Sequence, residues 1–160
     1  MLAYHRRPVC LSLVSTDLPV WSAVETAATL YQRDGQRFHL LLSEPLIQGG
    51  SPFIESATTG DPNSPRLLWL EISPYRAMMT MQHSGQFNYR HLWEQGVYGL
   101  SRYWLREGVG GWSGQMRLRN FTRSLKLSGH PLPHYFRLEY ELWADKVRLG
   151  HYVLSLDIHH

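Results

Sequence analysis

The sequence contains a single cysteine, Cys10, and this scarcity excludes two kinds of structure. One cysteine forms no intramolecular disulfide and builds no cysteine-rich metal site. Because Cys10 lies in an apolar run, we expect a small buried side chain in a protein of a reducing, cytoplasmic compartment. No stretch approaches the roughly 18 consecutive apolar residues of a membrane-spanning helix, so the sequence predicts no membrane span.

Motifs of the common catalytic and cofactor sites are also missing. There is no G-x-S-x-G nucleophile elbow and no P-loop, and the glycines at positions 108, 110 and 114 do not have the G-x-G-x-x-G spacing. His130 and His134 are four residues apart, but the two intervening prolines exclude a helix that would place both on one face. We therefore expect no metal and no cofactor, and the sequence favours a protein that is not an enzyme.

The composition is that of a globular protein with a slight excess of positive charge. The 160 residues are predicted to form one domain, residues 1–160, with 43% hydrophobic, 12% aromatic and 18% charged residues. The net charge is +3, and the basic residues are arginines except for Lys126 and Lys146. Such a mild excess allows an acidic partner without requiring one.

A β-hairpin over residues 135–158 is the clearest structural signal. Apolar residues alternate with polar ones on both arms, and residues 116–127 read as the strand before them. A loop at residues 144–146 would place Leu138 opposite Tyr152, with the apolar sets of both arms on one side. Gly150 sits where the alternation changes, which indicates a β-bulge.

Two segments have helical spacing. Residues 17–35 favour a helix, although Asp34-Gly35 is also a turn signal and leaves a hairpin as the alternative. Residues 88–104 favour a second helix, weakened by Gly96 and Gly99. Residues 48–65 are predicted to form an irregular loop. The predicted fold class is therefore α+β: one antiparallel sheet of about six strands, with one or two helices on one face, completed by the C-terminal hairpin.

Arginines on the strand at residues 116–127 form the strongest candidate site. Arg117, Arg119, Phe121 and Arg123 point the same way in an extended strand, where they could hold an anion or a nucleobase. Arg102 and Arg106 could add to this field if the preceding helix folds back. The alternative is a solvated face on which the arginines pair with Glu139 and Glu141 of the next strand.

Two further features of the C-terminal hairpin bear on function. Trp143, Val147 and Leu149 are apolar near the turn, on an otherwise charged face, so we expect a helix, a loop or a partner to cover this tip. Glu139 is predicted to lie opposite His151, an arrangement that could serve acid–base catalysis. Such a pair is more commonly a cross-strand ion pair, which is the interpretation we favour.

Residues 101–107 and 127–132 resemble short strings of chorismate pyruvate-lyases. The two strings cover a small part of the chain, and too few residues separate them to hold the intervening strands of that family. No function is carried over from this resemblance.

Three classes of function remain. The first is a binding or assembly module whose basic and aromatic sheet face contacts an acidic protein partner. The second is an RNA- or single-strand-binding module that uses the same face. The third is a small-molecule-binding protein or enzyme with an aromatic pocket between the sheet and its helices. The sequence favours them in this order and predicts no oligomeric state.

Overall fold

The chain forms a closed antiparallel β-barrel. A computed structural model describes residues 3–44, 66–83, 87–105 and 114–160. Among these residues there are ten strands and no helix, and hence no helix that could cross a membrane. The strands are β1 Ala3–Ser15, β2 Trp21–Gln32, β3 Phe38–Glu44, β4 Arg66–Ile72, β5 Arg76–His83, β6 Phe87–Glu94, β7 Tyr98–Leu105, β8 Gly114–Ser128, β9 Tyr135–Ala144 and β10 Val147–Ile158.

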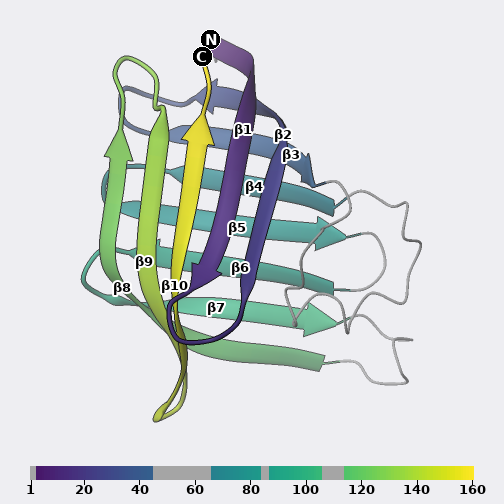
Figure 1. The fold of residues 1–160 in the computed structure, drawn as a ribbon, viewed down its shortest axis with the longest axis vertical. Helices are drawn as coiled ribbons and strands as arrows, with labels where there is room; N and C mark the ends of the chain where they lie inside the picture. Colours follow the sequence, from purple (N-terminus) through teal and green to yellow (C-terminus); the bar gives the residue numbers. More distant parts are fainter. Residues whose placement is uncertain (1–2, 45–65, 84–86, 106–113) are drawn as a thin grey trace.

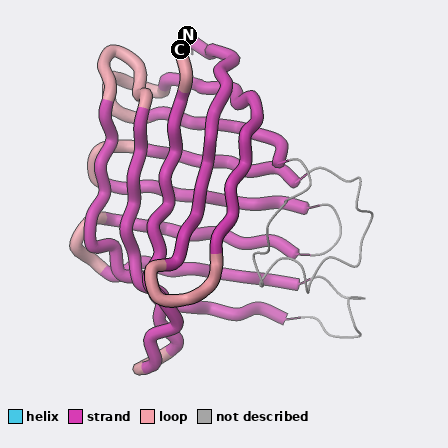
Figure 2. Tube along the Cα trace, in the orientation of Figure 1, coloured by secondary structure: helices cyan, strands magenta, loops and turns pink. Residues whose placement is uncertain are grey.

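Each strand pairs with the next one along the chain, and β1 pairs with β10 to close the barrel. In Figure 1, β1, β2, β8, β9 and β10 lie in front, and β3 to β7 cross behind them at a steep angle. Figure 2 shows the same two layers with strand along nearly the whole described trace. Closure leaves no free sheet edge, which removes the usual route to edge-to-edge aggregation.

Alternation of side chains places one apolar set inside the barrel and leaves the other set outside. On β3 and β4, Leu40 is paired with Leu70 and Leu42 with Leu68, and all four are buried. The opposite faces of these strands carry the exposed side chains of Leu41, Leu67 and Trp69. The largest fully buried side chains elsewhere in the core include Trp93, Phe136, Leu30, Ile72, Met81, Leu138, Leu154 and Leu156.

The α+β prediction, with a six-stranded sheet and helices, is wrong. Residues 17–35 cover the end of the β1–β2 turn, the strand β2 and the start of the β2–β3 turn, so the hairpin alternative is the one observed. The side chain of Asp34 accepts hydrogen bonds from the backbone N–H groups of Gln36 (2.9 Å) and Arg37 (3.0 Å) and so shapes this turn. The segment forms a strand in spite of its weak helical spacing, because β2 pairs with β1 on one side and with β3 on the other.

The second predicted helix is also wrong, since residues 88–104 form the β6–β7 hairpin. Its turn passes through Gly96, whose φ of 77° is unfavourable for other residues. The apolar stripe that indicated a helix divides between two faces: Trp93 is buried inside, whereas Leu92 is 42% exposed outside. Period-two alternation therefore describes this segment better than the helical period does.

The C-terminal hairpin is confirmed, with its register moved by two residues. Leu138 lies opposite Leu154, so the apolar sets share the inner side as predicted. The shift has two sources of one residue each: only Asp145 and Lys146 separate β9 from β10, with Asp145 at a φ of 52°, and the register then shifts again between Arg148 and Gly150. The predicted bulge at Gly150 is also confirmed. The predicted loop at residues 48–65 lies outside the described residues.

Candidate functional site

Three arginines stand side by side on the outer surface of the barrel. Arg90 on β6 is directly opposite Arg102 on β7, which is directly opposite Arg117 on β8. We call these three residues the arginine row. Like charges at directly opposed positions destabilise a sheet, so this arrangement costs the free protein stability.

No carboxylate among the described residues pairs with the arginine row. Arg90 Nε donates to the Thr80 hydroxyl at 3.2 Å, and Arg117 reaches only the side-chain oxygen of Gln115, at 3.5 Å. Arg102 Nε is buried and has no hydrogen-bond partner within the described chain. The row therefore presents guanidinium donors whose charge the described residues leave uncompensated.

The predicted site residues are partly brought together. Arg102 and Arg117 become neighbours, as expected, although Arg102 reaches its place on a strand rather than on a helix. Arg90 was missed, because only the β6–β7 register places it beside them. Arg106 lies outside the described residues.

Arg119 and Phe121 form an aromatic extension of the site with Tyr98. The Arg119 guanidinium carbon lies 5.1 Å from the centre of the Tyr98 ring, within range of a cation–π contact. Phe121 packs on the same ring, with 5.0 Å between ring centres. Arg119 also donates to the backbone oxygen of Asp145 at 2.7 Å, which fixes its side chain against the β9–β10 turn. The predicted combination of arginine and aromatic ring is present, with Tyr98 added.

Arg123 serves a different purpose, because it pairs with Glu141 on β9. The register of β8 shifts between Thr122 and Ser124, next to this pair. Glu141 is only 5% exposed, so the ion pair neutralises a buried carboxylate. The contacts of Arg123 therefore match the alternative predicted from the sequence, a structural ion pair with the next strand.

The prediction that Glu139 lies opposite His151 is wrong, because His151 lies opposite Glu141. The His151 side chain nevertheless reaches Glu139 diagonally, in a polar cluster at the β1–β10 seam. His151 Nε2 is 3.2 Å from Glu139 Oε2, and its Nδ1 is 2.6 Å from the hydroxyl of Thr16. The backbone N–H of His151 donates to Asp17 Oδ1 at 3.0 Å and is the main reason why the pKa of Asp17 is lowered. These contacts tie the β1–β2 turn to β9 and β10, which is a structural role.

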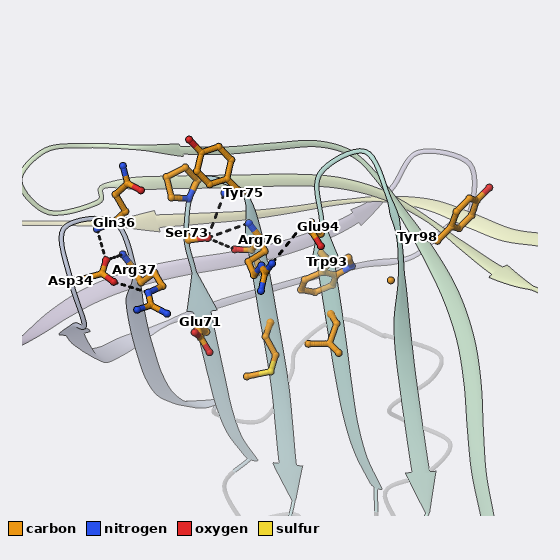
Figure 3. A pocket seen from close by; sticks show the side chains of 15 residues that line it. Asp34, Gln36, Arg37, Glu71, Ser73, Tyr75, Arg76, Trp93, Glu94 and Tyr98 are labelled. Atoms are coloured by element: carbon orange, nitrogen blue, oxygen red, sulfur yellow. Dashed lines mark hydrogen bonds and ion pairs between the residues drawn. The ribbon is translucent and has the colours of Figure 1, made fainter.

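A cleft of about 670 Å³ opens at the ends of β3 to β7 (Figure 3). We call it the turn-end cleft, because the β2–β3 and β4–β5 turns form part of its wall. Met78, Leu92 and Trp93 give it apolar surface, and Glu71 and Glu94 lie on it together with Arg76. The described residues that line it are Asp34, Gln36, Arg37, Glu71, Ser73, Pro74, Tyr75, Arg76, Ala77, Met78, Leu92, Trp93, Glu94, Tyr98 and Gly99.

The carboxylates of the turn-end cleft differ in how far they are engaged. Asp34 accepts two backbone N–H groups and pairs with Arg37 at 2.7 Å, and these contacts lower its pKa. Glu94 is 3.7 Å from Arg76, and Glu71 is 3.5 Å from His39 Nε2, with no hydrogen bond to either carboxylate among the described contacts. Asp34 is thus the most firmly held carboxylate, whereas Glu94 is loosely paired with Arg76 and Glu71 with His39.

Inside the barrel, a buried polar cluster joins β6, β7 and β8. His91 Nδ1 is 2.7 Å from the Ser101 hydroxyl, which also accepts a hydrogen bond from the Asn120 amide at 2.9 Å. Burial lowers the pKa of His91 to about 3, so its ring is neutral at physiological pH. The Asn120 amide also donates to the backbone oxygen of Leu92 at 3.1 Å, which links β8 to β6 across β7.

The predicted apolar tip of the last hairpin is less open than expected. Val147 is 62% exposed, whereas Leu149 packs against the core and Trp143 is half-buried. Trp143 lies opposite Arg119 in the β8–β9 ladder, so it borders the arginine site rather than forming a separate surface. A partner covering this tip remains a prediction.

Comparisons with known proteins bear on the fold alone. No protein-family profile matches the chain, and no curated protein matches it. Among solved structures, the chain is similar to the ywiB protein from Bacillus subtilis, with a TM-score of 0.55 and 11% sequence identity over 97% of this chain and 94% of that one. At this identity the likeness supports the barrel architecture and assigns no function.

Proposed function

We propose that the protein is a binding or assembly module whose outer barrel face contacts an acidic protein surface. The observation that carries this proposal is the arginine row: three directly opposed guanidinium groups without a carboxylate partner among the described residues. An acidic partner would relieve the repulsion within the row and satisfy the free donors through charge-assisted hydrogen bonds. The cytoplasmic location predicted from Cys10 belongs to the same proposal.

The surroundings of the row favour a protein over a nucleic acid. Exposed apolar side chains of Leu41, Leu67 and Trp69 lie on the outer faces of β3 and β4, where a partner with apolar residues could bury them. Binding to single-stranded nucleic acid is therefore the second candidate, supported by the aromatic pair Tyr98 and Phe121 beside Arg119.

A defined probe tests the proposal. A fluorescent peptide of alternating glutamate and leucine should bind at low salt, as measured by anisotropy, and a peptide with glutamine in place of glutamate should not. The double variant Arg102→Glu/Arg117→Glu should bind the acidic peptide at least about ten-fold more weakly, since it replaces two attractive charges with repulsive ones.

The matched control is Lys126→Glu/Lys146→Glu, which changes the net charge equally at two exposed residues outside the row. Equal weakening by both double variants would mean that only the net charge matters and would contradict the proposal. A single-stranded oligothymidine of the same charge as the peptide separates the two candidates, because stronger binding of the oligonucleotide would favour the nucleic-acid function.

A further inference from the structure

The central residue of the arginine row is the one whose charge most needs a partner. Arg102 is half-buried, whereas Arg90 and Arg117 on the two adjacent strands are exposed. Opposed positions on neighbouring strands are about 4.8 Å apart, so the three side chains leave the sheet within roughly 10 Å of one another. Water compensates a half-buried charge less well than an exposed one, so a negative group bound at Arg102 would stabilise the protein most.

The hydrogen-bond donors of the row are largely unused by the described residues. Arg90 donates only through its Nε, to a threonine hydroxyl, so its two terminal nitrogens have no described partner. Arg102 makes no hydrogen bond within the described chain, and Arg117 has only one long contact, at 3.5 Å. Arg123, by contrast, is already paired with a buried carboxylate. Since each guanidinium carries five N–H donors, the row offers a ligand a dense set of donors on one face.

We infer that the acidic partner presents a phosphorylated side chain to the arginine row, held over Arg102 by all three guanidinium groups. The inference rests on the proposed function, because it names the group that the same face recognises. A phosphorylated side chain carries a charge of about −1.5 to −2 at neutral pH and three strong acceptor oxygens. One such group can therefore accept hydrogen bonds from three guanidiniums at once and offset most of their charge. The planar fork of arginine suits this bidentate contact better than a lysine ammonium does.

Carboxylates match the row less well than one phosphoryl group does. Each carboxylate carries a single charge, so three of them would have to stand about 4.8 Å apart to compensate the row. On an extended partner segment, side chains of one face recur only about every 6.6 Å. On a helix, carboxylates at i and i+4 come within about 5–6 Å, but like charges at these positions destabilise the helix. A phosphodiester of a nucleic acid also carries only one charge.

Three peptides that differ in one residue test the inference by fluorescence anisotropy at low salt. Their central residue is phosphoserine, glutamate or serine, and the other residues are neutral. The phosphoserine peptide should bind the wild type at least about ten-fold more tightly than the glutamate peptide does, and the serine peptide should not bind. Arg102→Lys keeps the charge but loses the planar fork, so it should weaken the phosphoserine complex at least about five-fold. The matched control Arg33→Lys, at an exposed arginine outside the row, should leave this complex unchanged.

Competition experiments identify the source of the phosphoryl group. Inorganic phosphate should displace the labelled phosphoserine peptide only at concentrations at least about ten-fold higher than the unlabelled peptide requires. Displacement at equal concentrations would overturn the inference in favour of a small phosphate ligand. An oligothymidine that competes better than the unlabelled peptide would overturn it in favour of a nucleic acid.

Equal affinities for the phosphoserine and glutamate peptides would also overturn the inference, as would an Arg102→Lys variant that binds the phosphoserine peptide like the wild type. The peptide of alternating glutamate and leucine separates this failure from failure of the proposed function. If that peptide binds through Arg102 and Arg117 and phosphoserine brings no gain, the row recognises carboxylates of an acidic protein. If neither kind of peptide binds, both proposals are wrong.

Discussion

Replacing Gly99 with alanine should be strongly destabilising. A Cβ at this position would lie far inside van der Waals contact distance of the Leu92 backbone oxygen and 2.8 Å from Asn120 Oδ1. The backbone of β6 cannot yield as a flexible side chain would, so β7 must move away. Overpacking of this kind costs about 1–3 kcal/mol. Displacing the Asn120 amide from Leu92 adds about 0.5–1.5 kcal/mol for the lost hydrogen bond.

We therefore expect Gly99→Ala to lower the free energy of unfolding by roughly 3 kcal/mol, measured by urea denaturation with circular dichroism. Gly35→Ala is the matched control, because a Cβ at Gly35 meets no atom within 4 Å and its φ lies outside the left-handed region. The control should be neutral or stabilising by about 0.4–1 kcal/mol. A Gly99→Ala variant within about 0.5 kcal/mol of the wild type would refute the close approach of β6, β7 and β8.

Two further predictions concern charge. His91 stays neutral in the folded protein down to a pKa of about 3 but titrates near 6.5 when unfolded, so the unfolded state binds the extra proton. The free energy of unfolding should therefore fall as the pH drops from 6.5 towards 3, and His91 should account for up to about 1.4 kcal/mol of this loss per pH unit. The urea midpoint of His91→Gln should depend less on pH than that of the wild type. Arg102→Gln should stabilise the free protein by about 0.2–1 kcal/mol at low salt, because it interrupts the arginine row. In thermal melts this gain in stability should shrink at about 0.5 M salt, which screens the charges. A variant less stable than the wild type would contradict the idea that the three arginines repel one another.

Strands could be predicted from the sequence where the alternation was long and clean. The arms of the last hairpin and the strand at residues 116–127 contain long runs of alternating apolar and polar residues, and their location is confirmed. The first half of the chain lacks that clarity. In β2, the buried residues Val24 and Ala28 are four apart, a spacing that fits both a helix and a strand, and pairing with β1 and β3 decides between the two.

The fold class was wrong because closure of the barrel is a non-local property. The ladder between β1 and β10 joins residues almost the whole chain apart, such as Val9 and Ile158. No local pattern shows that these two strands meet, since both simply read as strands with one apolar face. Once they pair, every other strand has a neighbour on each side, and no helix is needed to cover a sheet edge.

The candidate site shows the same division between local and non-local information. The alternation on β8 placed Arg117 and Arg119 on one face, because that requires only an extended chain. Recognising Arg90 required the β6–β7 register, which the mistaken helix concealed. That register depends on Gly99, where the missing side chain lets β6 approach β7, and on Asn120, whose amide binds the freed carbonyl of Leu92. The glycine that weakened the helical interpretation is thus a residue that helps to align the arginine row.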